Sequence, residues 1–360
     1  MELMRSKVNW DIEKERLHLL KEMHERIKVW RGRHPDLLEI FQRSEIERLL
    51  LDSMNFCTVE DNYQGNRFIE FVARSGYKNE PELDAETDRP LLRRTTILHL
   101  VVRGRASRWR QLIDELFEIY HRLDANYVDE TGFTHYHAAC QAGRADLVVR
   151  FLELQLINPG LLVEETGESG LHLALPDRED AFEEPLRRAA WTTADLLMRR
   201  GADPIAADHK LVTALHLICQ GGYDNLLHLY LSQNRVASEI DARDHAGNTP
   251  LHLALERGHR TIALRLLQHE ADPHPVNAAG ATPLRLIFEH TNNIFHLAKM
   301  LYEVCVASRR DPEWNGRLRL GSEEAAKLLI RSDWNPAKPD PHDDVAATLQ
   351  IFLRKKESAV

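Results

Sequence analysis

A short phrase that recurs along the chain is the strongest constraint on what these 360 residues can fold into. Its clearest copy is Thr249-Pro250-Leu251-His252, and the last position returns at intervals of 33 to 44 residues (285 − 252 and 216 − 172). The residues at that position are His99, His137, His172, His216, His252 and Arg285. A phrase with this spacing indicates a stack of similar units, each too small to bury its apolar face alone.

The best-preserved unit, residues 244–274, has the signals of two short helices joined by a turn. Thr249 and Pro250 are typical of a helix start, and Gly258 is typical of a helix end. Residues 261–269 then place apolar side chains at helical spacing. Helices of about two to three turns are stable only when they are packed against neighbours. The sequence therefore predicts an all-α fold of stacked helix–turn–helix units.

The recurring histidines invite a metal or catalytic interpretation, but a structural one is favoured. In a turn that opens a helix, an imidazole ring can bridge the threonine hydroxyl and nearby backbone groups. Stacked helix layers lie roughly 10 Å apart, so histidines in successive units are too far apart to share a metal ion. We therefore interpret His99, His137, His172, His216 and His252 as structural anchors, and we expect no metal site.

The composition limits the class of function. The net charge is −9, and a nucleic-acid binder needs a basic face, so we expect no nucleic-acid partner. No apolar stretch of about 18 residues occurs, so we expect no membrane partner. The N-terminus is too charged for a secretory signal, and the four cysteines form no CxxC pair. Cys140 and Cys219 are expected to be small buried apolar residues. We therefore expect a cytoplasmic protein with access to the nucleus. We also expect a monomer.

Three phrases carry a resemblance to a known family: residues 247–254 (GNTPLHLA), 196–204 (LLMRRGADP) and 280–284 (GATPL). In these residues the chain resembles an ankyrin-repeat protein. In style it is similar to the divergent ankyrin-repeat proteins of insects, particularly parasitoid wasps. The resemblance implies a solenoid of stacked helix–turn–helix units whose tips are short β-turns or hairpins, with helical caps at both ends.

The resemblance covers residues 89–305, which divide into six units: 89–128, 129–162, 163–206, 207–242, 243–275 and 276–305. Residues 1–88 are expected to form a helical N-terminal cap or degenerate repeats, with helices at 9–31, 37–51 and 67–75 and an acidic connector at 78–90. Residues 306–360 are expected to form a helical C-terminal cap with helices at 322–331 and 343–355. The amphipathic helix 9–31 could bind a partner, but packing against the first repeats is favoured.

Two departures from the pattern are informative. Leu211 stands at the turn position that glycine occupies in other units. The longest spacing exceeds the shortest by 11 residues (44 − 33), and the excess lies near residues 176–190, between the two helices of the third unit. Such a loop is either a tolerated surface insertion or a binding feature.

The sequence contains none of the short motifs that mark common enzymes. GxxxxGK[ST], GxGxxG after a strand, HExxH and GxSxG are all missing. Its carboxylate runs lack the apolar surroundings that would tune a carboxyl group for acid–base catalysis. We therefore expect no enzyme activity and no cofactor.

The resemblance implies a concave groove lined by the turn tips and by the exposed face of each first helix. The tip positions are Asp129, Glu130, Phe133, Glu164, Glu165, Glu168, Asp208, His209, Lys210, Arg243, Asp244, His245, Asn277 and Ala278. The first-helix positions are Gln141, Gln220, Glu256, Arg257 and Glu289. The second and third units carry several carboxylates at these positions, which favours a partner with a basic segment. The alternative is that acidic tips only keep the protein soluble.

The expected function is a non-catalytic scaffold that binds a partner protein in this groove. One alternative is an inhibitor that masks a transcription factor. Another is a substrate receptor of a ubiquitin ligase that recruits through the C-terminal helices, although the Leu-Pro-rich opening of an F-box is missing from this sequence.

Overall fold

The computed structural model describes residues 2–57, 63–104, 109–155, 157–175, 184–232, 239–272, 275–283 and 286. Across these ranges the chain is helical, and extended pairing is confined to isolated bridges, so the all-α prediction is confirmed. The predicted helices at 322–331 and 343–355, the cap at 306–360, and Leu284, Arg285 and Glu289 lie outside the described residues.

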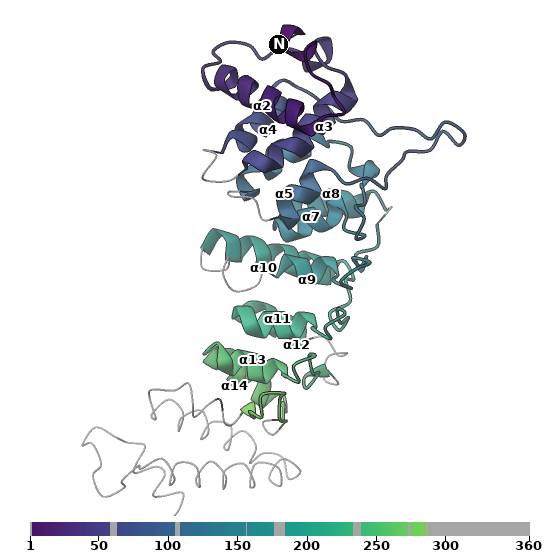
Figure 1. Cartoon of the computed structure of the whole chain (residues 1–360). Coiled ribbons are helices and arrows are strands. Elements are labelled where there is room, and N and C mark those ends of the chain that lie inside the picture. The colour runs from purple at the N-terminus through teal and green to yellow at the C-terminus, as the bar shows by residue number, and fades with distance from the viewer. Residues whose placement is uncertain are drawn as a thin grey trace, which may run out of the picture. The chain divides into compact units, whose positions relative to one another are not determined.

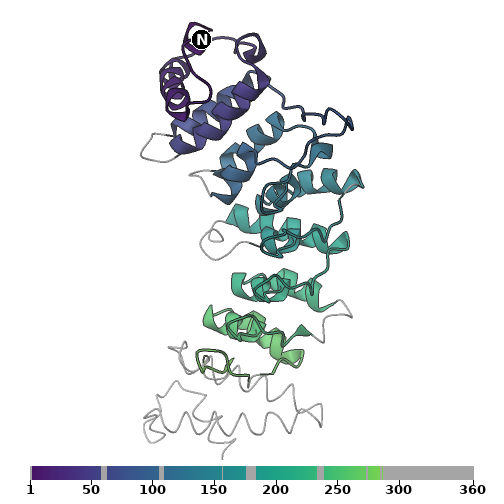
Figure 2. The same ribbon diagram turned by 45° about the vertical axis from the view of Figure 1, so that its right-hand side comes forward.

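Contacts divide the chain into two compact units, which are described separately. Unit 1 comprises residues 1–174 and 183–203, and unit 2 comprises residues 175–182 and 204–360. Figures 1 and 2 show that the helices of each unit form successive layers. The boundary predicted between residues 88 and 89 falls inside unit 1, because the N-terminal helices pack on the first repeat.

Unit 1 begins with an N-terminal helical region and continues with three helix pairs. The N-terminal helices are α1 (Glu2–Arg5), α2 (Glu13–Lys28), η1 (Leu37–Glu39), α3 (Arg43–Asp52), η2 (Ser53–Phe56) and α4 (Gln64–Arg74). The following elements are α5 (Ile97–Arg103), η3 (Trp109–Leu112), α6 (Ile113–Ile119), η4 (Leu123–Ala125), α7 (His135–Gln141), α8 (Ala145–Glu153), α9 (Gly170–Ala174) and α10 (Glu184–Arg199). First helices pack on first helices, since α7 contacts both α5 and α9, and α8 contacts α10.

The helices α3 and α4 continue this stacking toward the N-terminus. Helix α3 contacts α5, and α4 contacts α6, which is the register of a repeat. Helix α2 lies on α3 and α4 and buries Leu19, Leu20 and Met23 against them. Residues 43–74 therefore have the arrangement of a degenerate repeat, and α2 covers it. The N-terminal helix is packed against neighbouring helices, as favoured from the sequence, but it packs on this degenerate repeat and not on the first of the six units as expected.

The connector between α4 and α5 projects from the helices as a narrow loop (Figure 1). An isolated antiparallel bridge joins Leu83 to Pro90 near its tip. Its base is held by ion pairs from Arg94 to Glu82 at 3.3 Å and from Arg122 to Glu80 at 3.3 Å.

The third helix pair departs from the sequence expectation. The extra residues near 176–190 were expected to form a loop, but residues 184–190 are helical and lengthen α10 to 16 residues. Ala190 in this added segment is buried, and α10 contacts α8 and α9, so packing stabilises the longer helix. Residues 176–183 lie outside the described residues.

Unit 2 contains two described helix pairs. They are α11 (Ala214–Gly221) with α12 (Asp224–Leu231), and α13 (Pro250–Glu256) with α14 (Arg260–Gln268). Helix α11 packs on α13, and α12 contacts α14. Leu215, Ile218, Leu251 and Ala254 are fully buried between the first helices.

A threonine–histidine pair begins α5, α7, α11 and α13 and joins each of them to the following turn, and Ser169 takes the place of the threonine at α9. The Thr134 backbone N–H donates to Nδ1 of His137 at 3.1 Å, so histidine takes the place of the glutamate in an ordinary capping box. Because Nδ1 accepts this bond, the ring's proton lies on Nε2, which donates to the Leu161 carbonyl of the following turn at 3.0 Å. The structural interpretation of the repeated histidines agrees with this geometry.

The same bridge recurs in both units. Nε2 of His99 reaches the Tyr127 carbonyl at 3.2 Å in unit 1. In unit 2, Nε2 of His252 reaches the Ala281 carbonyl at 3.2 Å. Burial lowers the pKa of His99 and of His137 to about 4, so these rings are neutral at physiological pH.

Candidate functional site

The candidate site is the turn tips of each unit, and four of these tips are built around one side-chain acceptor, whereas Val163 stands at the equivalent place in the tip of residues 163–168. Asp208 Oδ1 accepts from the backbone N–H groups of Lys210 and Val212, each at 2.8 Å. Its own N–H donates to the Val212 carbonyl at 2.9 Å and closes the loop. Asp129, Asp244 and Asn277 occupy the same place in their tips and accept equivalent bonds. These residues shape the turn and leave its other side chains to point outward.

Adjacent tips are joined by main-chain hydrogen bonds. Glu165 N–H donates to the Thr131 carbonyl at 3.0 Å in unit 1. In unit 2, His245 N–H donates to the Lys210 carbonyl at 2.9 Å, and Ala278 N–H donates to the Ala246 carbonyl at 2.8 Å. The tips within a unit are therefore held in fixed register without the use of a side chain.

The fourth residue adopts a left-handed backbone in the four tips that begin at Asp129, Asp208, Asp244 and Asn277. Gly132, Gly247 and Gly280 have φ values of 83°, 72° and 74°. Leu211 has φ of 59° at the equivalent position in the tip that begins at Asp208. This conformation costs a residue with a side chain about 1–2 kcal/mol. The missing glycine noted in the sequence is thus a point of backbone strain.

Most predicted tip residues are accessible, and two are not. Glu130, Glu164, Glu165, His209, Lys210, Arg243 and His245 are exposed, whereas Glu168, Asp208 and Asp244 are partly buried. Phe133 is buried and packs edge-on against His99, with ring centroids 6.2 Å apart. Asp129 is also buried, because it accepts bonds from its own turn. Phe133 and Asp129 were predicted to contact a partner, and their burial corrects that prediction.

The acidic tips of unit 1 are partly neutralised by two arginines. Arg103, at the end of α5, lies between Asp129 at 2.9 Å and Glu165 at 3.5 Å. Arg93 pairs with Glu164 at 3.2 Å. The sequence interpretation did not include these bases, because it considered the second and third units alone. Arg103 follows His99 by four residues, as Gln141 follows His137, and this repeat position could have revealed it.

The predicted first-helix residues lie at helix ends beside the tips. Gln141 and Gln220 are partly buried, Glu256 is exposed, and Arg257 caps α13. The Nε and one Nη atom of Arg257 are buried without a hydrogen-bond partner in the part of the chain that the structure describes. The site as a whole therefore offers polar and charged groups on fixed backbone, which suits recognition of another protein surface.

A second buried histidine accompanies the anchors in unit 1. His135 stands where the best copy of the phrase has Pro250, and its Nε2 lies 2.8 Å from the Thr96 hydroxyl. The rings of Tyr120 and Tyr127 pack around it, with centroids 5.1 Å and 5.3 Å away. Burial lowers the pKa of His135 well below its ordinary value. Its environment is that of a core residue.

The geometry gives no sign of catalytic chemistry in the described ranges. No group of three or more His, Cys, Asp or Glu side chains in them could hold a metal ion. Cys140 and Cys219 are fully buried, and burial raises the pKa of Cys140 to about 12, so its thiol is not activated. No helix in the described part of the chain is both long and apolar enough to cross a membrane.

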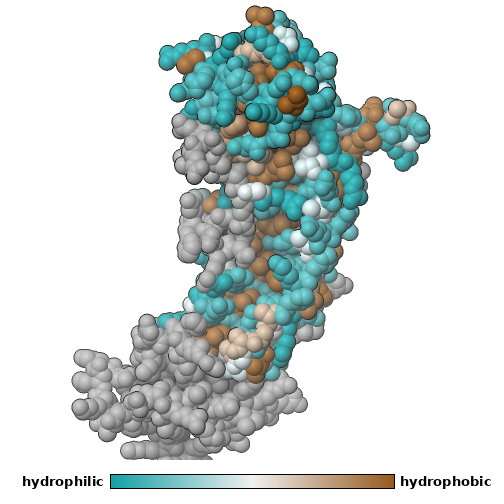
Figure 3. All heavy atoms as spheres, in the orientation of Figure 1, coloured by the Kyte–Doolittle hydropathy of each residue, from teal (hydrophilic) through white to brown (hydrophobic). Residues whose placement is uncertain are grey.

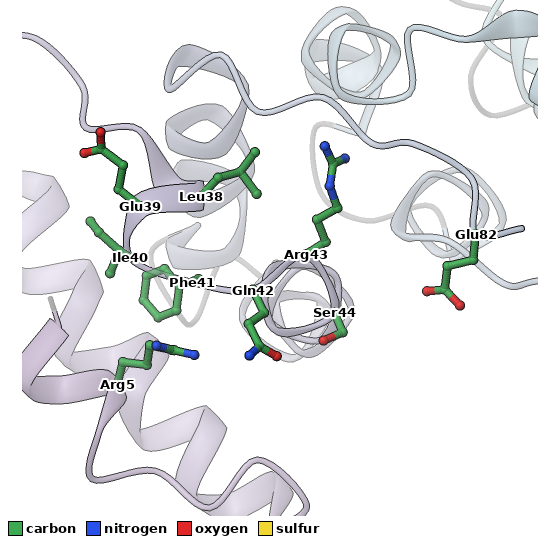
Figure 4. A pocket seen from close by; sticks show the side chains of 9 residues that line it. All are labelled: Arg5, Leu38, Glu39, Ile40, Phe41, Gln42, Arg43, Ser44 and Glu82. Atoms are coloured by element: carbon green, nitrogen blue, oxygen red, sulfur yellow. The ribbon is translucent and has the colours of Figure 1, made fainter.

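A shallow pocket of about 610 Å³ lies in the N-terminal helical region, away from the tips. Figure 4 shows its labelled side chains, which come from α1, η1, the link at residues 40–42, the start of α3 and the connector. The two arginines that line the pocket already have partners. Arg5 pairs with Glu45 at 2.8 Å, and Arg43 donates to the Lys78 carbonyl at 3.2 Å. The pocket therefore lacks free polar groups converging on one point, and we assign no ligand to it.

Comparison with known sequences identifies the repeat type. Residues 188–277 match the family model described as ankyrin repeats (3 copies). The mouse B-cell lymphoma 3 protein homolog is 30% identical over 183 residues, which are 49% of this chain and 38% of that protein. The chicken nuclear factor NF-kappa-B p105 subunit is 27% identical over 197 residues, which are 47% of this chain and 20% of that protein.

The match to a protein that is named as an enzyme is shorter than these two matches. The Hydra vulgaris tyrosine-protein kinase HTK16 is 28% identical over 102 residues, which are 28% of this chain and 14% of that protein. The chain thus spans less than two fifths of the length of each of these three relatives. The narrower resemblance to insect proteins stays a prediction.

Proposed function

This chain is an ankyrin-repeat protein, and on that premise we propose that it is a non-catalytic scaffold that binds a partner protein through its turn tips and first-helix ends. The observation that carries the proposal is the fixed register of the tips. Main-chain bonds between neighbouring tips hold exposed side chains in a set order, so little conformational entropy is lost on binding. The short match to the kinase gives no reason to assign catalysis to this chain.

The exposed tip residues supply the chemistry of recognition. In unit 2 the exposed tip side chains include Lys210 and Arg243, which favour carboxylates on a partner. In unit 1 the tips present Glu130, Glu164 and Glu165, which favour a basic segment. Because Arg93 and Arg103 already pair with two of these glutamates, we expect the attraction for a basic segment to be modest.

Affinity capture with quantitative mass spectrometry tests the scaffold function. The full chain is compared with Lys210→Glu/Arg243→Glu, which reverses two exposed tip charges. The matched control is Arg150→Glu/Arg260→Glu, which makes the same charge change on exposed positions of second helices. A partner retained by the control and lost by the tip variant supports the proposal. Equal recovery of every captured protein by both variants would exclude the tips as the binding surface.

A salt titration tests the basic segment. Reversal of Glu164, Glu165 and Glu168 to lysine is expected to weaken binding and to remove most of its salt dependence. The control is Arg93→Glu/Glu164→Arg, which exchanges the charges of one ion pair and preserves the net charge. If affinity and salt slope are the same for all three proteins, acidic tips serve solubility alone.

A second candidate is that the chain masks a transcription factor. It is favoured by the alignment of 197 residues with a protein named as a subunit of a nuclear factor. The test uses a transcription factor captured with the full chain, bound to its labelled DNA site. If the chain masks the DNA-binding surface of that factor, adding the chain should release the DNA. Unchanged DNA retention at saturating chain would contradict masking.

The ubiquitin-ligase alternative stays a proposal. It relies on residues 306–360, which lie outside the described residues. A cytoplasmic location with nuclear access also stays a proposal, as does the monomeric state. Recovery of ligase components with the full chain, and their loss after substitutions within 306–360, would favour the receptor over the plain scaffold.

A further inference from the structure

We propose that the C-terminal end of α2 is a second interaction surface, which binds an acidic peptide segment carrying one apolar side chain. The surface, here called the basic patch, consists of Lys28, Arg31, Arg33 and Arg67 around Val29 and Trp30. It uses none of the tip or first-helix residues of the repeats. The proposal therefore stands or falls independently of the groove.

The basic patch forms where α2 ends and the chain turns beside α4. The Trp30 N–H donates to the Ile27 carbonyl at 3.1 Å, and its indole Nε1 reaches the Arg33 carbonyl at 3.4 Å. The indole stands edge-on to Phe71 of α4, with ring centroids 5.8 Å apart. Helices α2 and α4 lie side by side in Figure 1, and contacts between them agree. The local backbone and the neighbouring helix thus hold Trp30 in place.

Three cations lie within three residues of this tryptophan in the chain, and α4 adds a fourth. Lys28, Arg31 and Arg33 are exposed, and none of them forms an ion pair within the described residues. Arg67 comes from α4, one helical turn before Phe71, whose ring contacts Trp30. Burial is the main cause of the lowered pKa of His24, and the charges of Arg67 and Lys28 lower it further.

A structural role accounts for part of this charge only. Lys28 lies in the last turn of α2, where a cation interacts favourably with the helix dipole. Arg31 and Arg33 follow the end of the helix, so an interaction with the helix dipole does not explain their positive charges. The acidic groups nearest along the chain are Glu25, one turn before Lys28, and Asp36. The patch therefore keeps an excess of positive charge.

The apolar part of the patch is accessible. Val29 is 70% exposed and Trp30 is 38% exposed, next to the free guanidinium groups of Arg31 and Arg33. Figure 3 shows that the N-terminal helical region is mainly hydrophilic on the face in view, with scattered hydrophobic residues. Exposed tryptophan beside arginine is the composition of a binding hot spot. This pairing favours a ligand with both a carboxylate and an apolar side chain.

The same observations disfavour a membrane or a nucleic acid. The apolar residues Leu19, Leu20 and Met23 of α2 are buried against α3 and α4, so the helix has no free apolar face for a bilayer. The patch offers four cations, fewer than the roughly six to ten phosphate contacts of a typical DNA-binding surface. The net charge of −9 would also repel an extended polyanion. A short acidic peptide avoids both problems.

Fluorescence anisotropy on the full chain tests the proposal. The probe is a fluorescein-labelled peptide of glutamates flanking a central leucine, with a serine-for-leucine version for comparison. We expect saturable binding that weakens with salt and with removal of the leucine. Arg31→Glu/Arg33→Glu is expected to weaken binding roughly tenfold or more. Val29→Asp, at an exposed position, is expected to weaken it without loss of helical circular dichroism.

The control Arg150→Glu/Arg260→Glu matches the charge change and is expected to bind the probe as the unaltered chain does. Three outcomes would overturn the proposal. They are no saturable binding, equal loss in the control and the patch variant, or displacement of the probe by an oligothymidylate or phosphatidylserine vesicles at concentrations where unlabelled peptide does not compete. If the tip variants still bind their partner, the scaffold proposal fails, but the peptide titration of the basic patch can still succeed.

Discussion

The Tyr120 hydroxyl, at the end of α6, donates a 2.9 Å hydrogen bond to the buried carboxylate of Glu47 in α3. Tyr77 and Asn79 donate to the same carboxylate at 3.0 Å and 2.9 Å, and Arg94 adds an ion pair at 3.0 Å. One side chain thus joins the degenerate repeat, the connector and the first repeat. Burial, and then the nearby Glu47 charge, raise the pKa of Tyr120, so its hydroxyl stays a donor.

Glu47→Gln is expected to destabilise unit 1 by about 2–4 kcal/mol, because it removes a charge that several buried donors share. Urea denaturation followed by circular dichroism measures the change. The matched control is Glu82→Gln, which removes an exposed partner of the same arginine and should cost less than about 1 kcal/mol. Equal effects of the two variants would show that the buried carboxylate does not hold these elements together.

Acid should destabilise the repeats through their buried histidines. Burial lowers the pKa of His99 and of His137 to about 4, whereas the ordinary value is 6.5. Between these values the unfolded chain binds more protons, so this stabilising contribution is present in full above pH 6.5 and is lost as the pH falls toward 4. Each histidine contributes a slope of about 1.4 kcal/mol per pH unit in that window.

His137→Asn provides the check on this slope. The variant should be less stable than the unaltered chain at pH 7, because the bond to the Leu161 carbonyl is lost. It should also lose less stability than the unaltered chain between pH 6.5 and pH 4.5. Replacement of the exposed His245 is the control for the loss of one histidine. Parallel profiles for all three proteins would contradict a role for His137 in acid sensitivity.

Leu211→Gly is expected to stabilise unit 2 by about 0.5–1 kcal/mol, because it relieves the left-handed backbone at φ 59°. Leu211 is 49% exposed, so little packing is lost. Gly280→Ala is the reverse test at an equivalent position, where a Cβ would meet no atom within 4 Å and backbone strain acts alone. It should destabilise by about 1 kcal/mol. A lower thermal midpoint for Leu211→Gly would contradict the strain.

Arg103→Met is expected to strengthen binding of a basic probe to the unit 1 tips by a few-fold, because it removes the cation that pairs with Asp129 and Glu165. An oligoarginine peptide, titrated by calorimetry at two salt concentrations, supplies the measurement. Arg150→Met is the control for the loss of one charge on a second helix. An unchanged affinity would mean that these carboxylates do not form a basic-peptide site.

The repeat phrase predicted the helix layers and the contact of each histidine with its threonine well. These contacts are local, since Thr134 and His137 are bonded within one helical turn. The network around Glu47 could not be predicted, because its donors are 30 to 73 residues away in sequence. Phe133 illustrates the limit for the site: the tip position was recognised, but its burial depends on the ring of His99 in the preceding layer. The helical part of the insertion was missed for a similar reason, since Ala190 in it is buried by contacts between layers.

The bonds between neighbouring tips connect main-chain atoms only, as in the pairing of the His245 N–H with the Lys210 carbonyl. Mutation of an exposed tip residue therefore changes what a partner meets and leaves the attachment between layers intact. Over generations, duplicated units can diverge in ligand preference one side chain at a time, while selection on folding acts mainly on the threonine, histidine and turn residues. Low identity between two such proteins is consequently compatible with a closely shared backbone and with entirely different ligands.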